Sequence, residues 1–167
     1  VEAFSFMPGY GIAVAAATLV GQNLGAGREQ DARISAYEAN RLAVLLMAAM
    51  GMVFFFFPYI LLRAFTSDPD VIKYGILYMK IVAFAQVPLA ITMVVGGALR
   101  GAGDTGFIMF GTIAGMWFVR LPLAALLAVV VKAEIHYVWS VMIFDWLIRM
   151  SLLIWRYRKI SWGRLEV

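Results

Sequence analysis

Three charged side chains, Arg120, Asp145 and Arg149, lie inside long apolar stretches of this 167-residue chain. A charge near the middle of a bilayer costs at least about 2.5 kcal/mol on insertion scales, so such residues usually face protein or water and mark function. If neighbouring helices are antiparallel, Arg120 and Asp145 reach a similar depth and could pair between helices. Asp145 and Arg149 are four residues apart and could instead pair on one helix face.

Either pairing leaves two arginines sharing one carboxylate. The surplus positive charge indicates a water-filled cavity or an acidic group on a further helix. Two roles remain open for these residues: a structural ion pair that joins two helices, or a charge pair that takes part in gating or coupling.

Two glycine-rich segments, 21–27 and 97–105, are the other candidates for chemistry. Neither contains the Gly-Lys-Ser/Thr of a phosphate-binding loop, and both follow apolar helices rather than a strand, so nucleotide binding is not expected. The chain has no cysteine and one histidine. No cluster of His, Cys and carboxylates suits a transition metal, and no nucleophile and base are spaced for catalysis. We therefore expect no enzymatic activity, no metal site and no cofactor.

The elements that position these residues are predicted from hydropathy. Hydrophobic residues make up 63% of the chain and charged residues 14%, far from the composition of soluble domains. Because a soluble protein could not bury several such helices on every side, we predict an all-α integral membrane domain with five transmembrane helices. The expected helices cover 3–21, 41–62, 71–98, 107–131 and 137–155, followed by a basic tail at 156–167.

The basic residues predict the orientation of these helices. With five spans, the connections 22–40 and 100–106 share a side with the basic tail, whereas the opposite connections carry only Arg63, Lys73 and Lys132. The positive-inside rule therefore places the C-terminus in the cytoplasm, in an inner or plasma membrane. The segment 27–40 reads as a short amphipathic helix on the cytoplasmic surface, with a solvated loop as the alternative.

Three stretches of the chain resemble the signature segments of the multidrug and toxic compound extrusion (MATE) family. They are Pro8-Gly9-Tyr10-Gly11, the run 19–27 and the run 99–105, which reads Leu-Arg-Gly-Ala-Gly-Asp-Thr. The resemblance covers essentially the whole chain. It marks a set of helix-exit residues: Pro8, Gly21, Gln22, Asn23, Gly25, Arg100, Gly101, Gly103, Asp104 and Thr105.

The resemblance implies a parent fold of twelve helices in two six-helix lobes around a central cavity. Trp162-Gly163-Arg164 in the basic tail resembles the C-terminal end of the family, which would make these helices the eighth to the twelfth. The odd number of spans and the absence of an initiator Met agree with a fragment. We expect the N-terminal lobe and the first helix of this lobe as partners, together with the lipid bilayer.

The resemblance also implies a function. It is that of a secondary active antiporter that exports amphipathic, often cationic drugs and toxic organic compounds in exchange for Na⁺ or H⁺, by alternating access. We expect the helices at 3–21 and 71–98 to line the cavity, because soft and aromatic side chains suit varied apolar cations. The candidate cavity residues are Met7, Tyr10, Phe84, Gln86 and Met93.

The helix at 71–98 contains no acidic residue, unlike family members that place an aspartate there. The site for the coupling ion is therefore expected mostly outside this chain. Two alternatives stay open. One is a flippase for lipid-linked sugars from the same superfamily, which would need a larger and more cationic cavity. The other is a membrane subunit that transports nothing and only packs against a partner.

Overall fold

Five helical segments of the computed structural model, which describes residues 2–132, 134–160 and 162, are long and apolar enough to cross a membrane. They are α1 (Glu2–Gly25), α2 (Glu29–Phe56), α4 (Pro69–Gly101), the segment Thr105–Val130 and α7 (Ile135–Lys159). The segment Thr105–Val130 is called the fourth span below. The predicted all-α membrane fold is confirmed.

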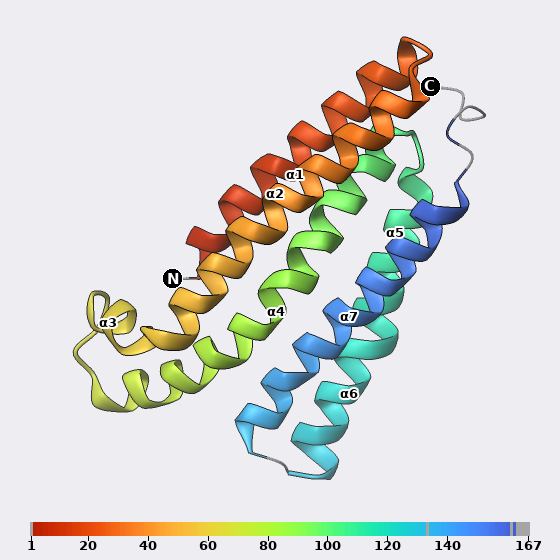
Figure 1. Cartoon of the computed structure of the whole chain (residues 1–167). Helices are drawn as coiled ribbons and strands as arrows, with labels where there is room; N and C mark the ends of the chain where they lie inside the picture. The colour runs from red at the N-terminus through yellow and green to blue at the C-terminus, as the bar shows by residue number, and fades with distance from the viewer. Residues whose placement is uncertain (1, 133, 161, 163–167) are drawn as a thin grey trace.

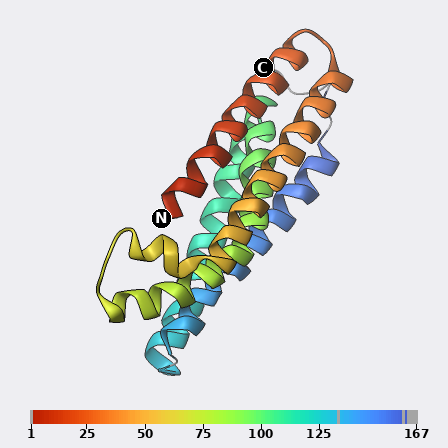
Figure 2. The same cartoon turned by 60° about the vertical axis from the view of Figure 1, so that its left-hand side comes forward.

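α4 lies at the centre of the bundle, between the α1–α2 pair and the pair formed by the fourth span and α7 (Figures 1 and 2). In its most apolar stretch of 18 residues, 67% of α4 is buried inside the protein, against 6% of the fourth span. Side chains of α4 enter each of the three apolar core clusters of the described residues. α4 is therefore the scaffold on which the other helices pack.

Small residues allow α1 and α4 to approach closely. A Cβ added to Gly97 would overlap the carbonyl oxygen of Ala13, and one added to Gly101 would overlap that of Ala17. One turn further along α1, a Cβ on Gly21 would lie 3.2 Å from the carbonyl oxygen of Gly101. Residues four apart on both helices thus form a contact of backbone against backbone, as small residues commonly do in membranes.

α2 differs from the prediction at both ends. It is continuous from Glu29, so the segment 27–40 is neither a separate helix nor a loop. Ala32 and Ala36 are buried in a core cluster, which gives the first turns of α2 an apolar contact of their own. At the other end, α2 stops at Phe56 and not at 62, because Pro58 has no N–H to donate and instead begins the short helix α3 (Pro58–Arg63).

The other helices also extend past the predicted apolar cores. α4 begins at Pro69, where the side chain of Asp68 accepts hydrogen bonds from the backbone N–H groups of Asp70 and Val71. α1 and α4 end just before Gly27 and Gly103, which have φ angles of 71° and 85°. That left-handed conformation is open to glycine and ends each helix cleanly.

The fourth span is not a uniform α-helix. It consists of α5 (Thr105–Ile113), the π-helix η1 (Ala114–Arg120), α6 (Leu121–Ala125) and the π-helix η2 (Leu126–Val130). Hydropathy did not predict these wider turns. π-helical turns are rare and frequently mark functional sites.

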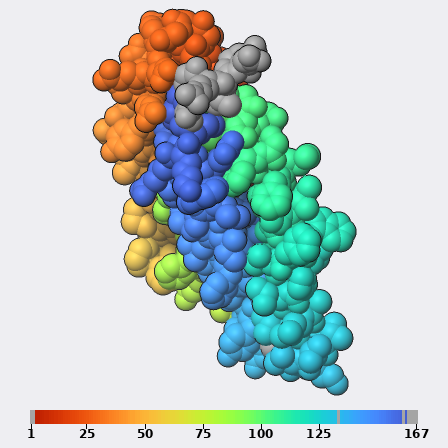
Figure 3. All heavy atoms as spheres, turned by 90° about the vertical axis from the view of Figure 1, so that its right-hand side faces the viewer, coloured from red at the N-terminus to blue at the C-terminus, as the bar shows by residue number. Residues whose placement is uncertain are grey.

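Figure 3 shows the face formed by the fourth span and α7, with the α1–α2 connection at the same end as the C-terminal turns of α7. Large apolar side chains of the fourth span are exposed, and Phe118 keeps 77% of its surface. Apolar surface of this extent fits lipid or further protein. Together with the five spans, it describes a multi-pass membrane protein.

Candidate functional site

An ion pair lies inside α7. Asp145 is completely buried, and its Oδ1 accepts a hydrogen bond of 2.7 Å from Nε of Arg149. The guanidinium of Arg149 also lies over the ring of Trp146, 5.2 Å from the ring centroid. Of the two pairings that the sequence allowed, the structure contains the local one. The other carboxylate oxygen, Oδ2, has no hydrogen-bond partner among the described residues.

Gly115 of η1 packs directly on this ion pair. A Cβ at this position would lie 2.5 Å from both Oδ1 of Asp145 and Nε of Arg149. The glycine therefore provides the space in which the pair sits against the fourth span. Glycines four residues apart, such as Gly111 and Gly115, commonly pack against a neighbouring helix in membranes, and what packs on Gly115 here is a charged pair.

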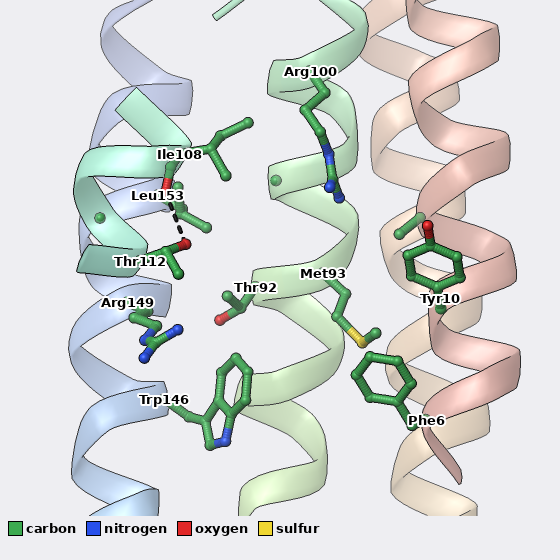
Figure 4. Close-up of a pocket in the computed structure, with 13 residues that line it drawn as sticks. Phe6, Tyr10, Thr92, Met93, Arg100, Ile108, Thr112, Trp146, Arg149 and Leu153 are labelled. Carbon is green, nitrogen blue, oxygen red and sulfur yellow. Dashed lines mark hydrogen bonds between the residues drawn. The ribbon is translucent and has the colours of Figure 1, made fainter. Parts of the chain in front are cut away.

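Arg149 lines a cavity of about 310 Å³ between α1, α4, α5 and α7 (Figure 4). The aromatic side chains Phe6 and Tyr10 of α1 stand on one side, and α5 and α7 stand on the other. Arg149 and Trp146 point into the space from α7, and Arg100 reaches into it from the end of α4. The lining residues are Phe6, Tyr10, Ala13, Thr92, Met93, Gly96, Arg100, Ile108, Gly111, Thr112, Trp146, Arg149 and Leu153.

The predicted cavity residues do not all meet. Tyr10 and Met93 line this cavity together. Phe84 lies on another face of α4, in a groove of about 250 Å³ shared with α2. Gln86 is fully buried, and its Nε2 donates to Oγ of Ser5 at 3.2 Å, which joins α4 to α1. Met7 keeps 72% of its surface on α1 and does not line the cavity that contains Tyr10 and Met93.

Several lining residues were missed by the sequence interpretation. Phe6, Thr92, Thr112 and Trp146 belong to the cavity. The two threonines were visible as polar residues within apolar spans, and Trp146 adjoins Asp145. The sequence does not show that these four residues line the same cavity. A helix that is apolar on all sides has no pattern that indicates which of its faces points towards a cavity.

Arg120 stands apart from the ion pair. It is exposed, and it lines a separate cavity with Tyr78, Trp139 and Met142. In the part of the chain that the structure describes, no carboxylate lies within ion-pair distance of Arg120. The three intramembrane charges therefore occupy two sites.

Apart from Pro8, the helix-exit residues belong to the C-terminal ends of α1 and α4 and the start of α5, at the upper end of the bundle in Figure 1. Asp104 forms an ion pair with Nε of Arg156 on α7, and Thr105 begins α5. Nδ2 of Asn23 donates to Oγ of Ser35 at 3.2 Å, which ties α1 to α2. The carbonyl of Gln22 accepts from the N–H of Ala26 in the turn after α1. These contacts hold the helix ends together.

The other exit residues have simpler surroundings. A Cβ on Gly25 would meet no atom within 4 Å. Pro8 lies inside α1, where it has no backbone N–H to donate. In the tail, Trp162 is buried and lies against Tyr157, with the guanidinium of Arg33 over its ring. Gly163 and Arg164 lie outside the described residues.

The arrangement of the helices matches that of a membrane transporter. The chain is similar to the crystal structure of the eukaryotic MATE transporter AtDTX14, with a TM-score of 0.84 over 94% of this chain and 35% of that one. At 23% sequence identity, the likeness shows the fold. The five spans therefore form part of the MATE transporter fold.

The sequence comparisons then give the family. The family model described as MatE matches residues 1–126. A probable multidrug resistance protein NorM from Thermotoga maritima is 35% identical over all 167 residues, and the multidrug resistance protein MdtK from Yersinia enterocolitica is 31% identical over 122 residues. The chain belongs to the MatE family, as its motifs indicated. It covers 36% and 27% of the length of these two relatives, about a third.

Proposed function

We propose that this chain forms five of the six helices in the C-terminal lobe of a secondary active transporter that exports amphipathic organic compounds by alternating access, in exchange for Na⁺ or H⁺. The observation that carries the proposal is the cavity between α1, α4, α5 and α7. It is walled by aromatic rings and a methionine, surfaces that accept varied apolar molecules. The names of the relatives, which are multidrug resistance proteins, support drugs as the exported class.

In this proposal the lobe supplies one wall of the transport pathway. The close contact of α1 with α4 through Gly97 and Gly101 makes these two helices move as one unit. The second wall comes from an N-terminal lobe with the first helix of this lobe, and alternating access is the rocking of one lobe against the other. The groups that bind the coupling ion, and acidic groups that hold the charge of cationic substrates, lie largely beyond these 167 residues.

We further propose that the C-terminus is cytoplasmic, in the inner or plasma membrane. Arg28, Arg33, Arg100, Arg156 and Arg158 belong to the helix ends and connections at the top of Figure 1. A concentration of arginines at one end supports that end as the cytoplasmic one.

The complete carrier, reconstituted in liposomes, tests the proposal. Fluorescent amphipathic dyes are loaded, and their movement is followed after a Na⁺ gradient or a pH gradient is imposed. We expect one of the two gradients to drive dye against its concentration gradient, and an ionophore that dissipates this gradient to stop the movement. Dye movement that ignores both gradients, or no dye movement and no dye binding, would contradict the proposal.

A further inference from the structure

We infer that the cavity of this lobe binds the carboxylate, or an equivalent anionic group, of an aromatic amphiphile, with Arg149 and Arg100 as its ligands. The inference rests on the proposed function, because it assigns a substrate class to the same cavity. It concerns the charge of the bound compound, which the proposed function leaves open for this lobe.

Arg149 is positioned in advance for an anion. Its Nε is held by the buried Asp145, and its side chain keeps only 11% exposure, so the guanidinium has little freedom. Gly115 and the ring of Trp146 confine the group further. Figure 4 shows the guanidinium pointing from α7 into the cavity. With Nε occupied, the terminal N–H groups remain as donors, and a guanidinium binds a carboxylate through two such groups at once.

The charges around the cavity favour an anion over a cation. Its lining contains two arginines and no aspartate or glutamate. Asp145 lies behind Arg149 and is engaged with it, and Asp104 is engaged with Arg156. No carboxylate lies within ion-pair distance of Arg100 among the described residues. A cation in this space would face the charge of Arg100, which no carboxylate of the described residues compensates, beside the guanidinium of the paired Arg149.

The hydroxyl groups of the cavity do not reverse this preference. The Thr92 hydroxyl donates to the carbonyl of Pro88 at 2.8 Å, and the Thr112 hydroxyl donates to that of Ile108 at 2.9 Å. Both therefore offer lone pairs rather than a donor. No charged residue occurs in α5, and Arg120 of η1 belongs to a different cavity. The charged donors of the site are thus Arg149 and Arg100, and the Tyr10 hydroxyl and the Trp146 indole N–H are neutral donors in the same lining.

The wall of the cavity formed by α1 favours a ligand with an aromatic ring system. The rings of Phe6 and Tyr10 are stacked, with centroids 6.1 Å apart and planes 11° from parallel. They stand across the cavity from Arg149 in Figure 4. At about 310 Å³ the space has the size of a small ligand pocket. A flat ring system against α1 and an acid group towards α7 would use both walls.

Three probes with the same ring system and different charges test the inference: 2-naphthoate, the neutral 2-naphthamide and the cationic 2-naphthylmethylammonium. Their equilibrium binding to the complete carrier is measured in nanodiscs of zwitterionic lipid, so that anionic headgroups do not compete. We expect naphthoate to bind at least about tenfold more tightly than the amide, as one strong charge-assisted contact would give. The ammonium probe should bind most weakly.

Substitutions test which residues produce the preference for naphthoate over the amide. In the double variant Asp145→Asn with Arg149→Gln, no buried charge is left alone, and we expect most of the preference for naphthoate to be lost, with only the contribution of Arg100 remaining. Arg149→Lys keeps the charge but loses the two-pronged contact, so most of the preference should also be lost. Arg100→Gln should weaken naphthoate severalfold. The matched control is Lys80→Gln, because Lys80 is exposed and lies near Phe55, away from this cavity.

Each outcome decides the inference. A wild-type carrier that binds the ammonium or the amide as well as naphthoate overturns it, and so does a preference that survives both the paired variant and Arg100→Gln. If gradients drive export of amphipathic dyes while naphthoate does not bind, the proposed function stands and the inference alone fails. If naphthoate binds as expected while no gradient drives any export, the inference stands and the transport function fails.

Discussion

At the scale of the residue, Asp145 and Arg149 form the most deeply buried ion pair in the described part of the protein. Asp145 has no exposed surface, and its partner keeps little. A buried ion pair adds little net stability over an apolar pair, but loss of one partner leaves an uncompensated charge. Arg149 and Asp145 should therefore tolerate joint neutralisation much better than removal of either charge alone.

Asp145→Asn alone should destabilise the complete carrier by about 3–5 kcal/mol, because Arg149 is left with no carboxylate. The double variant Asp145→Asn with Arg149→Gln should recover most of that loss. Thermal unfolding in detergent, followed by size-exclusion chromatography, measures both. If the single variant is as stable as the wild type, the pair has no structural role, and lost export in that variant would point to gating or coupling.

The charges of this site could be predicted from the sequence, because an Asp and an Arg stand out in an apolar stretch and their spacing is that of one helix face. The surroundings could not. Gln86 was placed in the cavity but is buried against Ser5, and Phe84 faces α2. Which face of an apolar helix points inward depends on its neighbours, and the sequence does not give their positions.

At the scale of the element, glycines, which have no Cβ, determine how closely α1 and α4 approach each other. A Cβ on Gly101 would overlap a backbone carbonyl, which cannot move aside as a flexible side chain can. Tight helix packing is the usual role of glycines four residues apart in a membrane, and the structure gives this role to Gly97, Gly101 and Gly21. Gly25 makes no such contact.

Gly101→Ala should force α1 and α4 apart and cost at least about 1–3 kcal/mol, the usual cost of overpacking. Gly11→Ala is the matched control, because a Cβ on Gly11 meets nothing within 4 Å. The midpoint of thermal unfolding of the complete carrier compares the two. Equal midpoints would show that the helices are not in backbone contact here.

The ion pair between Asp104 and Arg156 joins the start of α5, just after the α4–α5 turn, to the end of α7. Because Arg156 keeps 36% exposure, we expect Asp104→Asn to cost only about 1–2 kcal/mol. The effect should be local, with faster hydrogen exchange in the last turns of α7. Arg158→Gln, an exposed neighbour, serves as control. Unchanged exchange in Asp104→Asn would mean that the pair does not hold the end of α7.

Helix positions were predictable because the apolar runs are long, whereas helix ends were not. Hydropathy reports the part of a helix that lies in lipid, but α1 and α4 continue until Gly27 and Gly103 reverse the backbone. The π-helical turns of η1 and η2 depend on hydrogen-bond register rather than on hydropathy. Hydropathy therefore could not predict the π-helical turns.

At the scale of the whole molecule, we propose that the described residues form one side of a transport pathway. α4 is the buried scaffold, and the fourth span is exposed almost throughout. The cavity lies between these two helices, α1 and α7, and is partly open to the outside of the described bundle. This placement is what a lobe needs if a second lobe is to complete the substrate site.

Cysteine accessibility tests most directly whether this cavity is the substrate site. The chain has no cysteine of its own, so Thr112→Cys, at a position that lines the cavity, can be compared with Phe118→Cys, which is exposed on the outside of the same span. In a complete carrier without other cysteines, a membrane-impermeant thiol reagent should label Thr112→Cys and leave Phe118→Cys unlabelled within lipid. An exported compound should slow the labelling of Thr112→Cys at concentrations that saturate export. Labelling that no exported compound slows, or equal labelling at both positions, would contradict the account.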